Sequence, residues 1–398
     1  MGEAAVRRFN VLVLNQISPK GLERLPDDRY VVGKDVAAPD ALLLRSADLH
    51  QAVIANSVVA IGRAGAGTNN IPVKAMSERG VPVFNTPGAN ANAVKELVLA
   101  GMLMAARNLA PAMRFVAALD PQMPDMDKAV EDGKKAFAGY ELAGQTLGIV
   151  GLGKIGCLVA DAAIKLGMDV LGYDPDITVD AAWSLPAQVQ RAASVAAVLK
   201  QAQFITLHVP LVAATRDLVN ADNIGQLRAG SVLMNFSREG VVNEAAVIAA
   251  LDRKHLGWYV CDFPGAALNG HCGVIALPHL GASTREAEEN CAIMVADQLR
   301  DYLEHGNVAN AVNFPSVSMA RESRYRVAIA NANVPNMLGQ ISTAMAQAGL
   351  NIHNMVNKSR GDMAYTLVDV DSPVGDSVIG ALRAIDGVLA VRYLPHVA

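Results

Sequence analysis

Three glycines in the segment GLGKIG, residues 151–156, have the spacing that brings a peptide backbone close to a phosphate chain. The apolar run at 146–150 predicts a strand before them, and apolar residues at helical spacing over 155–166 predict a helix after them. Gly151 permits the tight turn, Gly153 lets the backbone approach a pyrophosphate, and Gly156 allows close packing of the helix on the sheet. Free N–H groups at the helix N-terminus favour an anion. The segment therefore predicts a dinucleotide site.

An acidic residue stands where such a site needs one. The apolar run at residues 168–173 predicts the next strand, and Asp174 follows it directly, about 20 residues beyond the glycines. A carboxylate there accepts the ribose hydroxyls and repels a 2′-phosphate, so NAD is expected rather than NADP.

The elements around this unit predict parallel sheets with helices on both faces, because strands and helices alternate along the chain. A Pro/Met/Asp-containing connection is expected at 111–139, before the glycine unit. The remaining strands are expected at 10–15, 41–44, 58–61, 81–85, 204–209, 232–236 and 258–261, and long helices at 92–108 and 285–303.

After a linker around residues 313–323, the last 74 residues restart the pattern as strand, helix, two strands, helix and strand, the ferredoxin-like βαββαβ order. The expected fold class is α/β, with two doubly wound Rossmann-like lobes and this C-terminal module. The expected domains are a discontinuous substrate lobe (1–95 and 285–315), an NAD-binding domain (96–284), a linker (316–324) and the C-terminal module (325–398).

The composition fits a large metabolic enzyme and excludes some partners. The 398 residues are 52% hydrophobic and 18% charged with a net charge of −4, which offers no basic surface for nucleic acid or membrane. We find no signal-peptide core, and the longest apolar stretch, 97–106, is too short for a membrane span. A cytoplasmic location is expected. The four cysteines lack CxxC spacing, so neither disulfides nor a metal site is expected.

Six strings carry a family resemblance. They are IGRAGAGTNNI (61–71), NTPGANANAVKEL (85–97), TLGIVGLGKIG (146–156), ITLHVPL (205–211), MNFSREG (234–240) and LPHLGAST (277–284). The chain resembles the D-isomer-specific 2-hydroxyacid dehydrogenases, and its C-terminal module resembles an ACT regulatory domain. The resemblance implies NAD contacts at Gly151, Gly153, Lys154, Ile155, Gly156, Asp174, His208, Pro210 and Asp262.

Oxidation of a 2-hydroxy acid needs a cation for the carboxylate and a base for the hydroxyl proton. Arg238 follows an expected strand end, where ligands bind in open α/β sheets, and can hold a carboxylate bidentately. His279 resembles the general acid/base of the family. The chain departs from the family at the glutamate that pairs with this histidine, because residues 259–268 contain none. Asp262 is the nearby carboxylate, either as partner of His279 or as a nicotinamide contact.

The resemblance also implies where the substrate binds. Arg45 and Ser46 match the pair that contacts a substrate phosphate, although an arginine in a loop is often only a surface charge. Backbone N–H groups at Gly65 and Gly67 would face the substrate carboxylate as an anion nest, and Asn90 matches a substrate-contacting asparagine. The expected substrate and product are 3-phosphoglycerate and 3-phosphohydroxypyruvate. A second reading keeps the enzyme class with hydroxypyruvate, glyoxylate or another 2-oxo acid.

In the C-terminal module, Asn333 and Asn351 match the asparagines that bind L-serine in ACT-containing relatives, and turn asparagines are the simpler alternative. Such modules bind ligand between two copies, so a homodimer or homotetramer with L-serine as effector is expected. A third reading is a non-enzymatic, NAD-dependent corepressor-like protein, which the missing glutamate favours and which Arg238 and His279 oppose.

Overall fold

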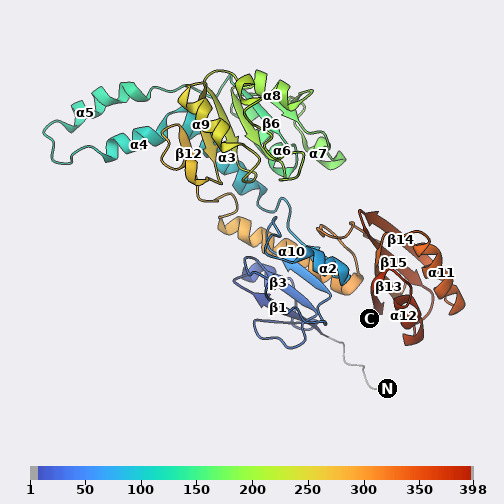
Figure 1. The fold of residues 1–398 in the computed structure, drawn as a ribbon. Helices are drawn as coiled ribbons and strands as arrows, with labels where there is room; N and C mark the ends of the chain where they lie inside the picture. The colour runs from blue at the N-terminus through green and yellow to red at the C-terminus, as the bar shows by residue number, and fades with distance from the viewer. Residues whose placement is uncertain (1–7, 396–398) are drawn as a thin grey trace. The chain divides into compact units, whose positions relative to one another are not determined.

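The computed structural model describes residues 8–395, which form two compact units. One unit comprises residues 1–90 and 285–398, and the other comprises residues 91–284. The chain passes between them at Asn90–Ala91 and at Thr284–Arg285. Both units contain parallel sheets, as the alternating pattern predicts (Figure 1). Within residues 8–395, no helix has the length and apolar character needed to cross a membrane.

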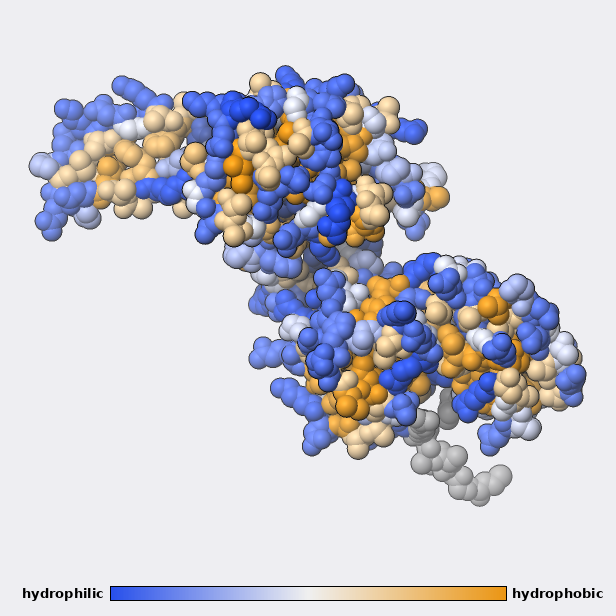
Figure 2. All heavy atoms as spheres, in the orientation of Figure 1, coloured by the Kyte–Doolittle hydropathy of each residue, from blue (hydrophilic) through white to orange (hydrophobic). Residues whose placement is uncertain are grey.

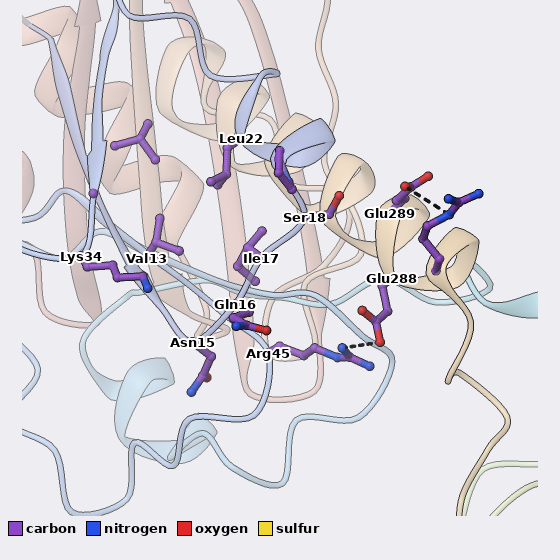
Figure 3. Close-up of a pocket in the computed structure, with 14 residues that line it drawn as sticks. Val13, Asn15, Gln16, Ile17, Ser18, Leu22, Lys34, Arg45, Glu288 and Glu289 are labelled. Atoms are coloured by element: carbon purple, nitrogen blue, oxygen red, sulfur yellow. Dashed lines mark ion pairs between the residues drawn. The ribbon is translucent and has the colours of Figure 1, made fainter.

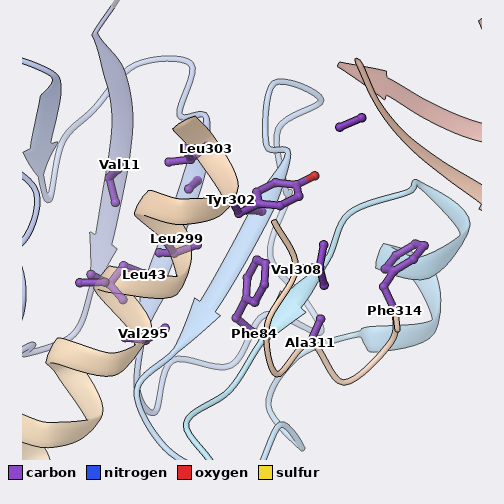
Figure 4. Packing of buried hydrophobic residues seen from close by; sticks show 14 of the residues in the cluster. Val11, Leu43, Phe84, Val295, Leu299, Tyr302, Leu303, Val308, Ala311 and Phe314 are labelled. Carbon is purple, nitrogen blue, oxygen red and sulfur yellow. The ribbon is translucent and has the colours of Figure 1, made fainter. Parts of the chain in front are cut away.

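The first unit opens with a five-stranded parallel sheet of order β2-β1-β3-β4-β5. Buried aliphatic side chains on one face pack against the long helix α10. The side chains of the other face pack in a second apolar cluster that includes Met76 of α2. Figure 4 shows Phe84 of the sheet beside Leu299 and Tyr302 of α10. The elements are β1 (Phe9–Leu14), α1 (Pro19–Leu22), β2 (Tyr30–Gly33), β3 (Ala41–Leu44), β4 (Ala60–Arg63), α2 (Val73–Glu78), β5 (Val83–Phe84) and α10 (Arg285–His305).

The C-terminal part of the same unit has the βαββαβ order expected from the sequence, and its antiparallel sheet has the order β14-β15-β13-β16. One face of this sheet packs on its own two helices. The other face joins the core built on α10, through side chains such as Tyr365 and Leu394. The elements are β13 (Tyr325–Ala332), α11 (Met337–Gln347), β14 (Ile352–Arg360), β15 (Met363–Val370), α12 (Asp376–Arg383) and β16 (Val388–Pro395).

The second unit is built on a seven-stranded parallel sheet of order β12-β11-β10-β9-β6-β7-β8. Helices α3 and α6 cover one face, and α8 and α9 cover the other. The elements are α3 (Ala91–Ala106), β6 (Thr146–Val150), α6 (Lys154–Lys165), β7 (Asp169–Tyr173), α7 (Val179–Ser184), β8 (Gln190–Arg191), α8 (Val195–Gln201), β9 (Phe204–Leu207), η2 (Ile224–Gln226), β10 (Ser231–Asn235), α9 (Glu244–Asp252), β11 (Leu256–Cys261), η3 (Ala266–Leu268) and β12 (Val274–Ala276).

One expectation needs correction. The connection predicted at 111–139 is largely helical, with α4 (Leu109–Ala117), α5 (Met126–Gly133) and the short helix η1 (Lys134–Phe137). These helices form an arm that extends from the sheet of the second unit (Figure 1), and no residue of α4 or α5 is buried. Prolines at 111, 121 and 124 and the shortness of the helices give the segment the sequence character of a loop. Figure 2 shows apolar residues along the arm among hydrophilic ones.

Candidate active site

The candidate residues of the second unit gather at one edge of its sheet. Gly151 follows β6, Asp174 follows β7, and His208 follows β9. The loops after β10, β11 and β12 carry Arg238, Asp262 and His279. Because all seven strands are parallel, the carboxyl ends that carry these residues share one edge, which is where ligands bind in doubly wound sheets.

The three glycines of the turn differ in their surroundings: at two of them a side chain would clash with the backbone, and at the third there is open space. Gly151 has φ +94°, and a Cβ on it would lie 2.4 Å from the His208 carbonyl oxygen. A Cβ on Gly156 would lie 2.1 Å from the Gly151 carbonyl oxygen. A Cβ on Gly153 would meet nothing within 4 Å. The fold itself therefore needs the first and third glycines, and the second leaves room for a phosphate chain.

The start of α6 and the acid after β7 complete the fit to a dinucleotide. Gly153 is the N-cap residue, so no side chain occupies the first N–H groups of α6. Lys154 is exposed and Ile155 is half-buried in the first turn. The Asp174 carboxylate accepts hydrogen bonds from the Leu152 N–H at 2.8 Å and the Asp176 N–H at 2.9 Å. An uncapped helix N-terminus and a half-buried acid in these places suit a pyrophosphate and a ribose, respectively.

His208 and Pro210 form the loop after β9, beside the glycine turn, because Val150 and Leu207 are register partners. The His208 Nε2 lies 3.0 Å from the Thr206 hydroxyl, and its Nδ1 is buried without a hydrogen-bond partner among the described residues. Burial lowers the pKa of this imidazole to about 3, so it is neutral at pH 7. Pro210 is exposed at the same edge.

Arg238 presents an exposed guanidinium from the loop after β10. The Asn235 side chain shapes this loop: its Nδ2 donates to the Arg238 carbonyl at 3.0 Å, and its Oδ1 accepts from the Ser237 N–H at 3.1 Å. The Arg238 Nη1 donates to the Ser237 carbonyl at 2.7 Å, which leaves other guanidinium N–H groups for an anion. Sequence reasoning did not single out Asn235, although a buried polar residue at a strand end is a recognisable signal.

Asp262 holds the His279 loop through the backbone. Its buried carboxylate accepts hydrogen bonds from the Leu280 N–H at 2.7 Å and the Gly281 N–H at 2.8 Å. The Asp262 carbonyl also accepts from the His279 N–H at 3.1 Å. Burial raises the pKa of the Asp262 carboxyl, and the two N–H donors and the nearby His279 offset part of that rise.

The His279 side chain is exposed, and its ring lies against Phe263 with centroids 4.5 Å apart. Its backbone has φ +56°, the left-handed region that non-glycine residues seldom adopt. The three backbone hydrogen bonds to Asp262 hold this conformation in place. Strained backbone fixed by its surroundings is common at functional sites. Phe263, which sequence reasoning missed, is a direct neighbour of this imidazole.

In the first unit, Arg45 and Ser46 follow β3 at the carboxyl edge of the five-stranded sheet. The Asn15 Oδ1 accepts a hydrogen bond from the Ser46 N–H at 3.2 Å, and the Arg63 Nε donates to the Arg45 carbonyl at 3.1 Å. The Arg45 Nη1 forms an ion pair with Glu288 at 2.7 Å (Figure 3). Neither Asn15 nor Glu288 was singled out from the sequence, because both act through residues distant along the chain.

The other candidates of the first unit lie in the loops after β4 and β5. Gly65 has φ +151°, and a Cβ on it would lie 2.0 Å from Nη1 of Arg63. Gly67 is half-buried in the same loop, and Asn90 is half-buried at the last position before the chain enters the second unit. These residues share the carboxyl edge with Arg45.

Asn333 and Asn351 lie at opposite ends of the C-terminal sheet. Ala332 pairs with Met363 at one end of β15, and Ile352 pairs with Val370 at the other. The eight residues of β15 span roughly 25 Å. Both asparagines are exposed. Within one copy of the chain, a ligand the size of an amino acid cannot contact both side chains. Among residues 8–395, no three His, Cys, Asp or Glu side chains gather as a metal site.

A glycine turn, an uncapped helix N-terminus and an acid at the edge of a doubly wound sheet are the features of a dinucleotide-binding domain. Residues 99–281 match the family described as D-isomer specific 2-hydroxyacid dehydrogenase, NAD binding domain. A Haemophilus influenzae protein named D-3-phosphoglycerate dehydrogenase is 32% identical over 356 residues, which cover 85% of this chain and 82% of the relative. The chain belongs to the D-isomer specific 2-hydroxyacid dehydrogenase family, as an NAD-dependent oxidoreductase.

Solved structures show the same fold. The TT0316 protein of Thermus thermophilus aligns with a TM-score of 0.60 and 26% identity, covering 76% of this chain and 100% of that chain. The NAD⁺-bound 3-phosphoglycerate dehydrogenase of Entamoeba histolytica aligns with a TM-score of 0.59 and 24% identity, covering 77% of this chain and 98% of that chain.

Proposed function

We propose that this enzyme oxidises D-3-phosphoglycerate to 3-phosphohydroxypyruvate with NAD, the first step of L-serine biosynthesis. The observation that carries the proposal is the relative of that name, 32% identical over most of both chains. Arg45 favours a phosphorylated substrate, because its guanidinium places a positive charge at the carboxyl edge of the first sheet.

Each catalytic task falls to a residue at the edge of the second sheet. Arg238 binds the substrate carboxylate through its exposed guanidinium, and His279 takes the proton from the C2 hydroxyl. When bound, NAD would supply the acceptor for the hydride from C2. The residues that would hold it are Gly151, Gly153, Lys154, Ile155, Gly156, Asp174, His208, Pro210 and Asp262.

Asp262 serves in this proposal as a positioning residue. Its carboxylate binds the N–H groups of Leu280 and Gly281 and so fixes the His279 backbone. The sequence YVCDFPGAAL at 259–268 contains no glutamate to pair with the imidazole. The negative charge of Asp262 lies near His279, and this proximity favours the ionised form of the Asp262 carboxyl.

Asp262→Asn tests this role. The amide keeps one acceptor but turns an NH₂ group toward a backbone N–H, so the loop loses a hydrogen bond and the charge. We expect kcat to fall at least about tenfold, and Asp262→Glu to restore part of kcat. A loss below threefold would contradict the role.

In the first unit, Arg45 and Ser46 bind the substrate phosphate in this proposal. The loop with Gly65 and Gly67 offers backbone N–H groups to the carboxylate, and Asn90 contacts the substrate. The half-buried glycine loop and the fixed backbone around Arg45 support these assignments.

The C-terminal module acts as an ACT domain that binds L-serine, and the enzyme is a homo-oligomer. Asn333 and Asn351 support both points, because one ligand reaches both only if they come from two copies. The arm of the second unit is a candidate contact between copies, since Met113 and Val116 are 68% and 54% exposed. Serine binding across two copies would lower activity by favouring one conformation of the enzyme.

The direct test follows NADH consumption by the purified enzyme with 3-phosphohydroxypyruvate, with and without L-serine, beside hydroxypyruvate. Turnover of the phosphorylated acid that L-serine suppresses supports substrate and effector together. Turnover of hydroxypyruvate alone overturns the proposed substrate. Absence of turnover with both acids, while NADH still binds, would instead support a non-enzymatic binding protein.

A further inference from the structure

A cavity of about 570 Å³ opens in the first unit at the carboxyl ends of β1, β2 and β3 (Figure 3). The connection from β1 leads to β2 on one side, whereas β3 lies on the other side of β1. This is the point where strand order reverses, the place where doubly wound sheets bind ligands. Asn15, Lys34, Arg45 and Glu288 line the cavity.

Arg45 and Glu288 meet on this cavity from distant parts of the chain. The Arg45 Nη1 lies 2.7 Å from the Glu288 Oε1, and the two side chains are 37% and 46% exposed. Exposed pairs of this kind hold weakly, because water solvates both charges when they separate. The pair can therefore open for a ligand that offers Arg45 a stronger partner.

The backbone beneath Arg45 is held independently of that pair. The Arg45 carbonyl accepts hydrogen bonds from Arg63 Nε at 3.1 Å and from Asn70 Nδ2 at 3.3 Å. The Asn15 Oδ1 accepts from the N–H groups of Ser46 and Ala47. The guanidinium can exchange Glu288 for a ligand without any rearrangement of its loop.

We propose that Glu288 is a specificity-determining residue that competes with the substrate for Arg45. This inference rests on the proposed function. A phosphate ester carries nearly two negative charges at pH 7 and three acceptor oxygens, so it displaces a single carboxylate from a guanidinium. The neutral hydroxyl of an unphosphorylated acid gains nothing from Arg45 and leaves the ion pair closed. Lys34 and Arg285, the other cationic residues that line the cavity, add to the attraction for the dianion.

Competition implies that removal of the Glu288 charge strengthens phosphate binding. In Glu288→Gln the KM for 3-phosphohydroxypyruvate is expected to fall about three- to tenfold, with kcat within twofold of wild type. The KM for hydroxypyruvate is expected to stay within twofold. Inorganic phosphate, tested as a competitive inhibitor, is expected to show the same gain.

Two further variants separate the inference from the proposed function. Asp297→Asn makes the same charge change farther along α10, where Asp297 pairs with Arg24 and Arg300 and does not line the cavity, so its KM values are expected to match wild type. Arg45→Ala is expected to raise the KM for the phosphorylated acid at least about tenfold.

If Arg45→Ala raises that KM but Glu288→Gln leaves it unchanged or raises it, Glu288 is not a competitor and the inference falls while the function stands. An equal fall of KM in Glu288→Gln and Asp297→Asn also overturns it, because a general charge effect would then explain both. If Arg45→Ala changes neither KM, the phosphate contact of the proposed function fails instead.

Discussion

The two ends of α10 contact their surroundings through different interactions: side-chain hydrogen bonds to helix carbonyls at the C-terminal end, and exposed ion pairs at the N-terminal end. At the C-terminal end, every carbonyl from Tyr302 to Gly306 accepts a side-chain hydrogen bond from the linker or the C-terminal module; the donors are Arg392, Arg321, Arg326 and Tyr365. At the N-terminal end, the glutamates at 286, 288 and 289 form pairs with Arg285, Arg45 and Lys20, all of them with at least one exposed partner.

A helix C-terminus carries a partial negative charge and carbonyls that have no partner within the helix. An arginine there stabilises the helix both through its positive charge and through hydrogen bonds to those carbonyls. Arg326 is fully buried and also binds Asp369 through Nε at 2.6 Å and Nη2 at 2.9 Å. Such a network cannot exchange partners without leaving a buried charge unpaired. The exposed ion pairs at the N-terminal end can exchange partners with little loss of free energy, which suits a ligand site. The buried network at the C-terminal end suits a fixed contact between α10 and the C-terminal module.

The largest effect is expected from Arg326→Met. The substitution leaves Asp369 buried without its cation and removes donors from the carbonyls of His305, Met319 and Ala320. We expect a loss of about 3–5 kcal/mol in the free energy of unfolding of this unit. Both tryptophans, Trp183 and Trp258, lie in the other unit, so urea unfolding is best followed by far-UV circular dichroism with hydrogen exchange at residues 302–306.

Lys20→Met is the matched control for that prediction, since it removes the cation that pairs with Glu289 at the N-terminal end. Lys20 is largely exposed, and we expect no resolvable change in unfolding. Equal losses in the two variants would contradict the distinction between a fixed end and an exchangeable end.

A smaller effect is expected from Tyr365→Phe. The buried hydroxyl donates to the Gly306 carbonyl at 2.8 Å, and its removal leaves that acceptor unsatisfied. We expect a loss of about 1–2 kcal/mol, measured by the same unfolding experiment. Tyr325→Phe is the control, because the Tyr325 hydroxyl makes no hydrogen bond within the described residues. An unchanged midpoint for Tyr365→Phe would show that water replaces the lost donor.

Local signals predicted the strand ends around the candidate cofactor site. The turn at Gly151, the acid at 174 and the strand ends before Arg238 and His279 follow from short stretches of sequence plus the rule that parallel strands share a carboxyl edge. The βαββαβ order of the C-terminal module was predicted for the same reason.

Contacts between distant segments could not be predicted in this way. The ion pairs of Arg45 with Glu288 and of Arg326 with Asp369 depend on how α10 packs in the first unit, and nothing local in the sequence marks them. The helices of the arm escaped prediction for a different reason, because they are short and stand among prolines at 111, 121 and 124, which are typical of a loop. The edge strand β2 is short and mostly half-buried, which weakens its pattern.

The smallest expected effect concerns His305, the last residue of α10. A helix C-terminus normally raises a histidine pKa, but burial lowers the pKa of His305. The carboxylates of Asp301 and Glu304 oppose that shift, and the cations Arg321 and Arg326 add to it, so the net change is downward. The imidazole thus protonates less readily in the folded state, so its contribution to stability is complete above about pH 6.5 and is lost as the pH falls toward the folded pKa. The Tm of wild type should therefore fall more between pH 7.5 and 5.5 than that of His305→Gln. Parallel curves would mean that burial does not keep the His305 imidazole uncharged in the folded protein.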